Sequence, residues 1–156
     1  MQISRFLSGL AIAASLGCYF ASLALPCFSP EDDPGIALLI FGPLGLFCGE
    51  IAWLANPCYL IATLCLLASL RHGMQSASQL ALRRISVVAA FLGVPLAIRF
   101  AMQSSTYYGE HSVGEKSNIT ELLVGYWLWL TAMTLIAIAS LAGCFFPTEI
   151  RSTQET

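Results

Sequence analysis

The chain has 156 residues, of which 57% are hydrophobic and only 10% are charged, and its formal net charge is −2. Soluble domains carry roughly 25% charged residues, so this composition indicates an integral membrane protein and excludes an ordinary water-soluble globule. The small negative charge also argues against nucleic acid as a partner, because nucleic-acid-binding proteins present a basic surface.

Residues 6–25 are the first predicted membrane helix. They are twenty uncharged residues, and at ~1.5 Å per residue they span the ~30 Å hydrocarbon core of a bilayer. The alternative is a signal peptide over residues 1–24, with Ser22-Leu23-Ala24 as its cleavage site. The apolar run is longer than the ~7–15 residues usual for a signal peptide, which favours a retained helix.

The next apolar stretch, residues 36–71, is too long for one crossing and too short for two. It contains one carboxylate, Glu50, and it ends at an arginine. One crossing uses ~20 residues, which residues 51–70 supply. Residues 36–49 remain as a short segment interrupted by glycine and proline, and this pattern predicts a re-entrant or interfacial helix on the outer side.

Two more crossings are predicted at residues 85–103 and 122–146, separated by the longest polar loop of the chain. The expected fold is therefore all-α, a single transmembrane bundle over residues 1–147. It has four membrane helices and one short outer segment, and a polar cytoplasmic tail follows at residues 148–156.

Positive charge predicts the orientation of the chain. With the N-terminus in the cytoplasm, both acidic loops lie outside, and Lys116 is the only cation in an outer loop. Five arginines then face the cytoplasm: Arg5, Arg71, Arg83, Arg84 and Arg151. We therefore expect a bacterial inner-membrane protein with both termini in the cytoplasm.

Two stripes of small side chains recur at four-residue spacing, one in the first span and one in the third. Lipid does not drive helices together by the hydrophobic effect, so close backbone approach along small residues favours association. The stripes are Gly9, Ala13, Gly17 and Ala21, and Ala89, Gly93, Ala97 and Ala101. Both are predicted to be helix-packing surfaces.

Glu50 and Arg99 are ionisable residues at predicted membrane depth. Both lie about one turn inside the outer interface, where a charge is costly unless it meets a partner or water. We expect them to form an intramembrane ion pair. The alternatives are separate solvation by the headgroups, which arginine reaches easily, and a functional proton or substrate site.

Asn56-Pro57 interrupts the second span near its start. Pro57 has no amide hydrogen, so it releases the carbonyl of Trp53, four residues earlier. The side-chain amide of Asn56 is close enough in sequence to satisfy that carbonyl. The motif is predicted to be a helix break or cap, and a ligand contact through these three residues is the alternative.

The sequence shows little that would support catalysis. None of the six cysteines forms a C-x-x-C pair, and Cys27, Cys48 and Cys58 are the disulfide candidates. Four-span thiol oxidoreductases have a similar span count but rely on paired cysteines in outer loops, and the loop at residues 104–121 has none. No metalloprotease, serine-hydrolase or phosphate-loop motif is present, so we expect no metal, no cofactor and no enzymatic activity.

The stretch Ala52-Trp53-Leu54-Ala55-Asn56-Pro57, which follows a glycine-spaced apolar run, resembles one in small uncharacterised bacterial four-span inner-membrane proteins. The resemblance covers residues 36–70 and implies no activity. Some toxin-immunity proteins are also similar in size and span count.

These features predict a non-enzymatic multi-pass protein that acts through helix–helix and outer-loop contacts. Its expected partners are the lipid bilayer, another membrane protein or a second copy of itself, in an accessory, immunity or assembly role. One alternative is a small channel or transporter subunit that uses Glu50 and Arg99. The other is a membrane thiol-redox protein, which needs Cys48 and Cys58 to react together.

Overall fold

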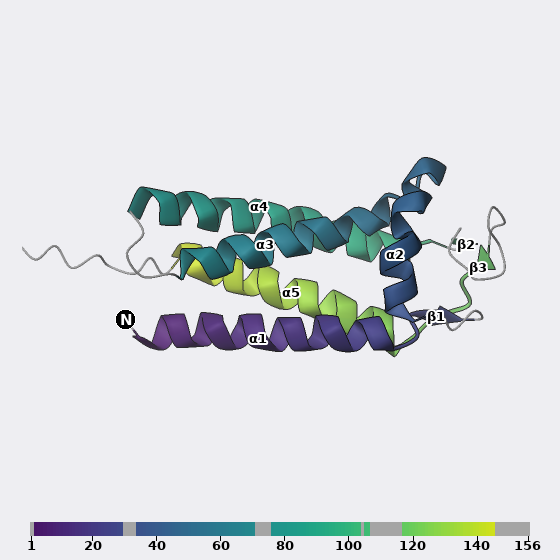
Figure 1. The fold of residues 1–156 in the computed structure, drawn as a ribbon, viewed down its shortest axis with the longest axis horizontal. Coiled ribbons are helices and arrows are strands. Elements are labelled where there is room, and N and C mark those ends of the chain that lie inside the picture. The colour runs from purple at the N-terminus through teal and green to yellow at the C-terminus, as the bar shows by residue number, and fades with distance from the viewer. Residues whose placement is uncertain (1, 30–33, 71–75, 104, 107–116, 146–156) are drawn as a thin grey trace, which may run out of the picture.

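Four long antiparallel helices form the body of the protein. A computed structural model describes residues 2–29, 34–70, 76–103, 105–106 and 117–145. The long helices are α1 (Gln2–Ala24), α3 (Ala55–Ser69), α4 (Ser76–Ala101) and α5 (Val124–Phe145). A shorter helix, α2 (Gly35–Gly45), crosses one end of the bundle (Figure 1). The predicted all-α bundle is confirmed.

Within the described residues, four helices are long and apolar enough to cross a membrane. They are Phe6–Ala24, Ile51–Ser69, Ala77–Ala101 and Val124–Cys144. The predicted spans agree within two residues, except that the third begins at residue 77 rather than 85. Hydropathy marks only the apolar part of a helix, and α4 starts with a polar, arginine-containing segment. The tail predicted at residues 148–156 lies outside the described residues.

The apolar segment predicted at residues 36–49 is α2 followed by a 3₁₀ turn, η1 (Leu46–Cys48). With eleven residues, α2 is too short to cross a bilayer. A second 3₁₀ turn, η2 (Ile51–Leu54), leads into α3. Gly49 lies between the two turns with φ of 87°, a left-handed conformation that glycine adopts without a Cβ clash. This glycine turns the chain from the end of the bundle into its second crossing.

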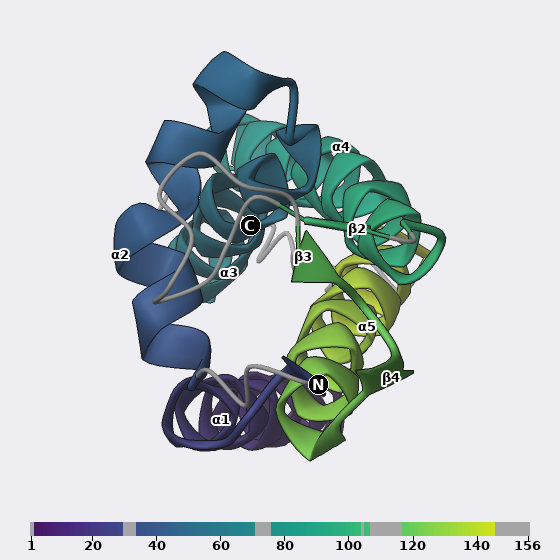
Figure 2. The same ribbon diagram turned by 90° about the vertical axis from the view of Figure 1, so that its right-hand side faces the viewer.

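Two short strand pairs lie beyond the end of the bundle that carries α2, here called the α2 end (Figures 1 and 2). The antiparallel pairs are β1 (Phe28–Ser29) with β4 (Glu121–Leu122), and β2 (Ser105–Thr106) with β3 (Ser117–Asn118). Beside the first pair, the amides of Leu123 and Gly125 donate to the carbonyls of Cys27 and Pro26, both at 2.9 Å. These bonds join the end of α1 to the start of α5, and the two helices pack along each other.

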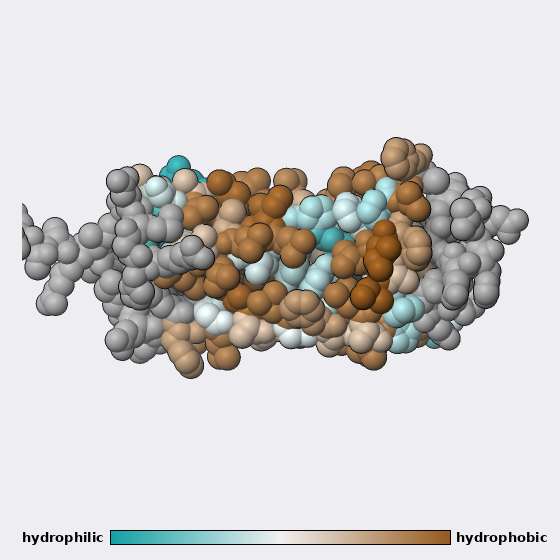
Figure 3. All heavy atoms as spheres, in the orientation of Figure 1, coloured by the Kyte–Doolittle hydropathy of each residue, from teal (hydrophilic) through white to brown (hydrophobic). Residues whose placement is uncertain are grey.

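The outside of the bundle suits a lipid environment. Hydrophobic residues cover most of the helical surface seen in Figure 3. Exposed apolar side chains occur on every long helix, among them Phe20 on α1, Leu64 on α3, Val88 on α4 and Ile138 on α5. Acyl chains solvate such a surface, whereas water does not.

The stripe in α4 packs inside the bundle as predicted, apart from its last member. Ala89 and Ala97 are buried, and Ala101 is exposed at the end of the helix. A Cβ built on Gly93 would lie 3.2 Å from the Cβ of Cys58. Small residues therefore let α4 approach α3 closely, as expected for membrane helices.

The stripe in α1 faces away from the bundle. Ala13, Gly17 and Ala21 are exposed, and among the described residues no atom beyond the helix's own backbone lies within 4 Å of a Cβ built on Gly9 or Gly17. The opposite face, with Ile12, Ser15, Tyr19 and Ser22, is buried. That face carries hydroxyl groups, which need partners at membrane depth, so it turns inward and the small residues turn outward.

Candidate functional site

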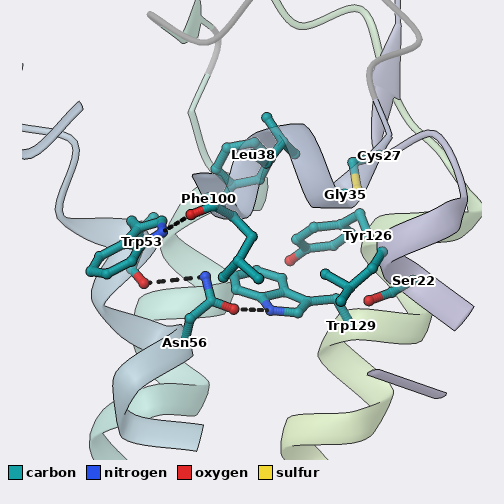
Figure 4. A pocket seen from close by; sticks show the side chains of 12 residues that line it. Ser22, Cys27, Gly35, Leu38, Trp53, Asn56, Phe100, Tyr126 and Trp129 are labelled. Carbon is teal, nitrogen blue, oxygen red and sulfur yellow. Dashed lines mark hydrogen bonds between the residues drawn. The ribbon is translucent and has the colours of Figure 1, made fainter. Parts of the chain in front are cut away.

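Asn56 is the centre of a hydrogen-bond cluster at the α2 end of the bundle. Its Oδ1 accepts hydrogen bonds from the Tyr19 hydroxyl of α1 at 3.1 Å and from the Trp129 indole of α5 at 2.9 Å. Its Nδ2 donates to the carbonyl of Trp53 at 3.3 Å (Figure 4). This is the carbonyl that Pro57 releases. The local contact expected from the Asn-Pro motif is therefore present, and the same side chain also ties α1 and α5 to α3.

Trp53 connects this cluster to α2. Its indole Nε1 donates to the carbonyl of Leu39 at 3.2 Å. The ring lies against Gly42, where an added Cβ would come within 1.8 Å of the Trp53 Cδ1. An added Cβ on Gly35 would lie 2.4 Å from the carbonyl oxygen of Ser22. Two glycines therefore let α2 sit directly on α1 and on Trp53.

Serine and tyrosine hydroxyls join α1 to α3 and α5 at mid-depth. Ser15 Oγ donates to the Ala132 carbonyl at 2.7 Å and lies 2.9 Å from the Tyr59 hydroxyl, which then donates to it. The rings of Tyr19 and Tyr59 stack with their centroids 4.6 Å apart. These contacts, rather than close backbone approach, link α1 to α3.

A second hydroxyl pair lies deeper in the bundle. Ser86 of α4 donates to the Ala62 carbonyl of α3 at 2.8 Å and lies 2.6 Å from the Oγ of Ser140 on α5. Both serines are fully buried. Hydrogen bonds of this kind in membrane proteins contribute about 0.6 kcal/mol each on average, so several together hold the helices in register.

Glu50 has a different partner from the one predicted. Its side chain is 5% exposed, and its carboxylate accepts a hydrogen bond from Nε2 of Gln103. Arg99 is on the exposed side of α4, and the described residues contain no ion pair between Arg99 and Glu50. The helix ends at Ala101, and the turn after it brings Gln103 to the carboxylate.

A cavity of about 60 Å³ lies beside Asn56 and beneath α2 (Figure 4). Residues from all five α-helices and from η2 line it, and most of the lining is apolar. No group of histidine, cysteine or acidic residues able to hold a metal ion occurs in the part of the chain that the structure describes.

The cysteines give no disulfide among the described side chains. Cys27 and Cys58, two of the three candidates, are thiols, and the Cys27 Sγ lies 3.8 Å from the Leu25 carbonyl oxygen. The side chain of Cys48 lies outside the described residues.

Four apolar helices, with a lipid-suited surface and a hydrogen-bonded interior, are the features of a multi-pass membrane protein. Comparisons with protein-family models, with curated proteins and with solved structures each return no match to this chain.

Proposed function

We propose that the chain is a non-enzymatic protein of the bacterial inner membrane that acts through contacts with another membrane protein or a second copy of itself. An accessory, immunity or assembly role fits such contacts. The observation that carries the proposal is that polar side chains in the bundle bond one another. Ser15, Asn56 and Ser86 each join two or more helices. Hydrogen bonds between helices hold a membrane bundle together, and a group that makes such bonds has fewer positions left for a substrate.

The exposed stripe of α1 supports a contact with a partner helix. Packing within the bundle does not explain its small residues, because the space outside Gly9 and Gly17 is open. In a bilayer, small residues at four-residue spacing allow a second helix backbone to approach closely. We therefore take Gly9, Ala13, Gly17 and Ala21 as the contact surface.

Replacing Ala13 by isoleucine tests this surface. We expect association to weaken roughly tenfold, equivalent to about 1.4 kcal/mol, because the larger side chain holds the partner backbone away. Energy transfer between labelled proteins in vesicles measures self-association, and crosslinking in native membranes measures other partners. The matched control is Ala142→Ile, since Ala142 is also exposed but lies on α5. Equal association of both variants and the parent would contradict a role for the stripe.

A channel or transporter subunit that uses Glu50 and Arg99 has less support. The Glu50 carboxylate is bonded to Gln103, and Arg99 is exposed on α4, so the two residues do not share one polar path. A thiol-redox role requires Cys48 to react with Cys58, and no contact between the two residues is described.

The charge distribution supports an orientation with both termini in the cytoplasm. Arg83 and Arg84 lie in the first part of α4, at the end of the bundle where α1 begins (Figure 1). Arginine and lysine accumulate on the cytoplasmic side of membrane proteins. The packing of α1 along α5 supports a retained first helix rather than a cleaved signal peptide.

A further inference from the structure

Glu50 is a buried carboxylate without a positive partner among the described residues. It lies one residue before the second span, in the unwound stretch between η1 and η2, and its side chain is 5% exposed. The hydrogen bond that its carboxylate accepts within this part of the chain comes from Gln103, which is neutral. A buried carboxylate needs a positive charge or several hydrogen bonds to offset its lost hydration. The described side chains therefore leave the charge of Glu50 unbalanced.

Gln103 brings a second oxygen to the same place. Its Nε2 atom donates to the Glu50 carboxylate, whereas its Oε1 atom is buried and has no hydrogen-bond partner in the described part of the chain. The two atoms belong to one carboxamide, so Oε1 lies within roughly 5 Å of the carboxylate. A buried oxygen without a donor is unfavourable. Carboxylate and amide oxygens are common ligands of hard metal cations, so this pair of groups favours a cation.

The end of α4 favours a cation for a separate reason. The helix ends at Ala101, two residues before Gln103, and it reaches the α2 end of the bundle (Figure 1). The C-terminus of a helix carries about half a negative elementary charge, which repels anions and attracts cations. The basic residue in the last turn, Arg99, is exposed and forms no ion pair with Glu50 in the described structure. In membrane transporters, unwound backbone and helix C-terminal ends coordinate Na⁺.

We infer that Glu50 and Gln103 bind one alkali-metal cation at the α2 end of the bundle, with the Glu50 carboxylate and Gln103 Oε1 as its side-chain ligands. A single positive charge balances the single carboxylate. Calcium takes about 6–8 oxygens, and the described residues offer no cluster of acidic side chains for it. The expectation that no metal binds rested on motifs for catalytic metals, which a site of this kind does not need.

The bound ion joins the stretch before α3 to the end of α4. Glu50 lies just outside the span that begins at Ile51, so ions in the aqueous phase at the α2 end can reach it. The ion is expected to stabilise this end of the bundle. The site does not involve the α1 stripe, so either proposal can fail without the other.

Thermal unfolding of the full-length protein in non-ionic detergent micelles tests the site, because an ion that binds the folded state stabilises it. The protein is compared in NaCl, KCl and choline chloride at equal ionic strength. At the midpoint temperature measured in choline, about 100 mM of the preferred ion should raise the ratio of folded to unfolded protein roughly tenfold, for a dissociation constant on the order of 10 mM. The larger response identifies the ion. Equal stability in all three salts, as expected if a proton neutralises Glu50, would overturn the inference.

Two variants assign the response to the two ligands. Glu50→Gln removes the charge and keeps the size of the side chain, so the response to the ion should be lost. Gln103→Met removes the amide oxygen and should weaken the response, and it keeps the test valid if the first variant does not fold. The matched control is Glu121→Gln, at an exposed position on β4, which should keep the full response. A response that persists in folded Glu50→Gln would overturn the site, and an unchanged response in Gln103→Met would overturn the second ligand.

Discussion

Replacing Asn56 by alanine is expected to lower the free energy of unfolding by about 2–4 kcal/mol. The change leaves the Tyr19 hydroxyl, the Trp129 indole and the Trp53 carbonyl without their partner. A buried polar group without a partner costs about 1–3 kcal/mol, whereas an average membrane hydrogen bond contributes only about 0.6 kcal/mol. The expected value lies above the sum of three average hydrogen bonds and at the lower end of the sum for three polar groups without partners. Reversible unfolding in mixed detergent micelles measures it.

Single-bond variants provide the control for Asn56. Tyr19→Phe removes one hydrogen bond to the Asn56 oxygen and keeps the ring, so it should cost about 0.6 kcal/mol. Trp129→Phe removes another and also loses packed ring volume, so it should cost more. If Asn56→Ala is no more destabilising than Tyr19→Phe, the hydrogen bonds of Asn56 do not stabilise the contact among the three helices. That result would remove the structural basis for the proposed role of the interior.

Replacing Gly42 by alanine should destabilise the protein by about 2–3 kcal/mol, because an extra methyl overpacks the contact with Trp53. The new Cβ would come within 1.8 Å of the indole ring, which is held by its bond to the Leu39 carbonyl. The ring must move and that bond must lengthen or break. Unfolding in micelles measures the stability, and a shift of tryptophan fluorescence reports the ring movement.

Gly143→Ala is the matched control for Gly42→Ala. It adds the same methyl within a helix, where the new Cβ would make only an ordinary contact, 3.8 Å from Leu66 Cδ1. Alanine is the better helix former by about 1 kcal/mol, so the stability should stay the same or rise slightly. If the two substitutions change the free energy of unfolding equally, Gly42 is not needed for the packing of α2 against Trp53.

The membrane spans could be predicted because hydropathy is a local property and the bilayer fixes the length of a crossing. The same reasoning predicted that the segment of α2 does not cross the membrane, and α2 has only eleven residues. The early start of α4 could not be predicted from hydropathy, since its first turns are polar.

The contacts of the site were predictable only where they are local. The bond from Asn56 to the Trp53 carbonyl follows from the proline that comes next in sequence. The partners on α1 and α5 depend on how the helices rotate and pack, which no local pattern determines. A signal did exist, because Ser15, Tyr19 and Ser22 place polar hydrogens on one face of an otherwise apolar helix.

The partner of Glu50 was mispredicted for a related reason. Counting residues placed Arg99 at the right depth, but depth does not fix the direction in which a side chain leaves its helix. Arg99 faces outward, where its long side chain can reach the interface. Gln103 reaches the carboxylate because the chain leaves the helical path after Ala101.

Labelling of single-cysteine variants with a membrane-impermeant maleimide tests the central claim, a four-span bundle in which Ser15 is closed to water and the α2 end faces the outside of the cell. The background is the protein with its six native cysteines replaced. Glu121→Cys marks the α2 end and Ser78→Cys the opposite end, both at exposed positions, and Ser15→Cys marks the buried interior. Intact cells should label position 121 only, permeabilised cells should add position 78, and position 15 should stay unlabelled. Labelling of position 15 in the folded protein, or of position 78 in intact cells, would contradict the account.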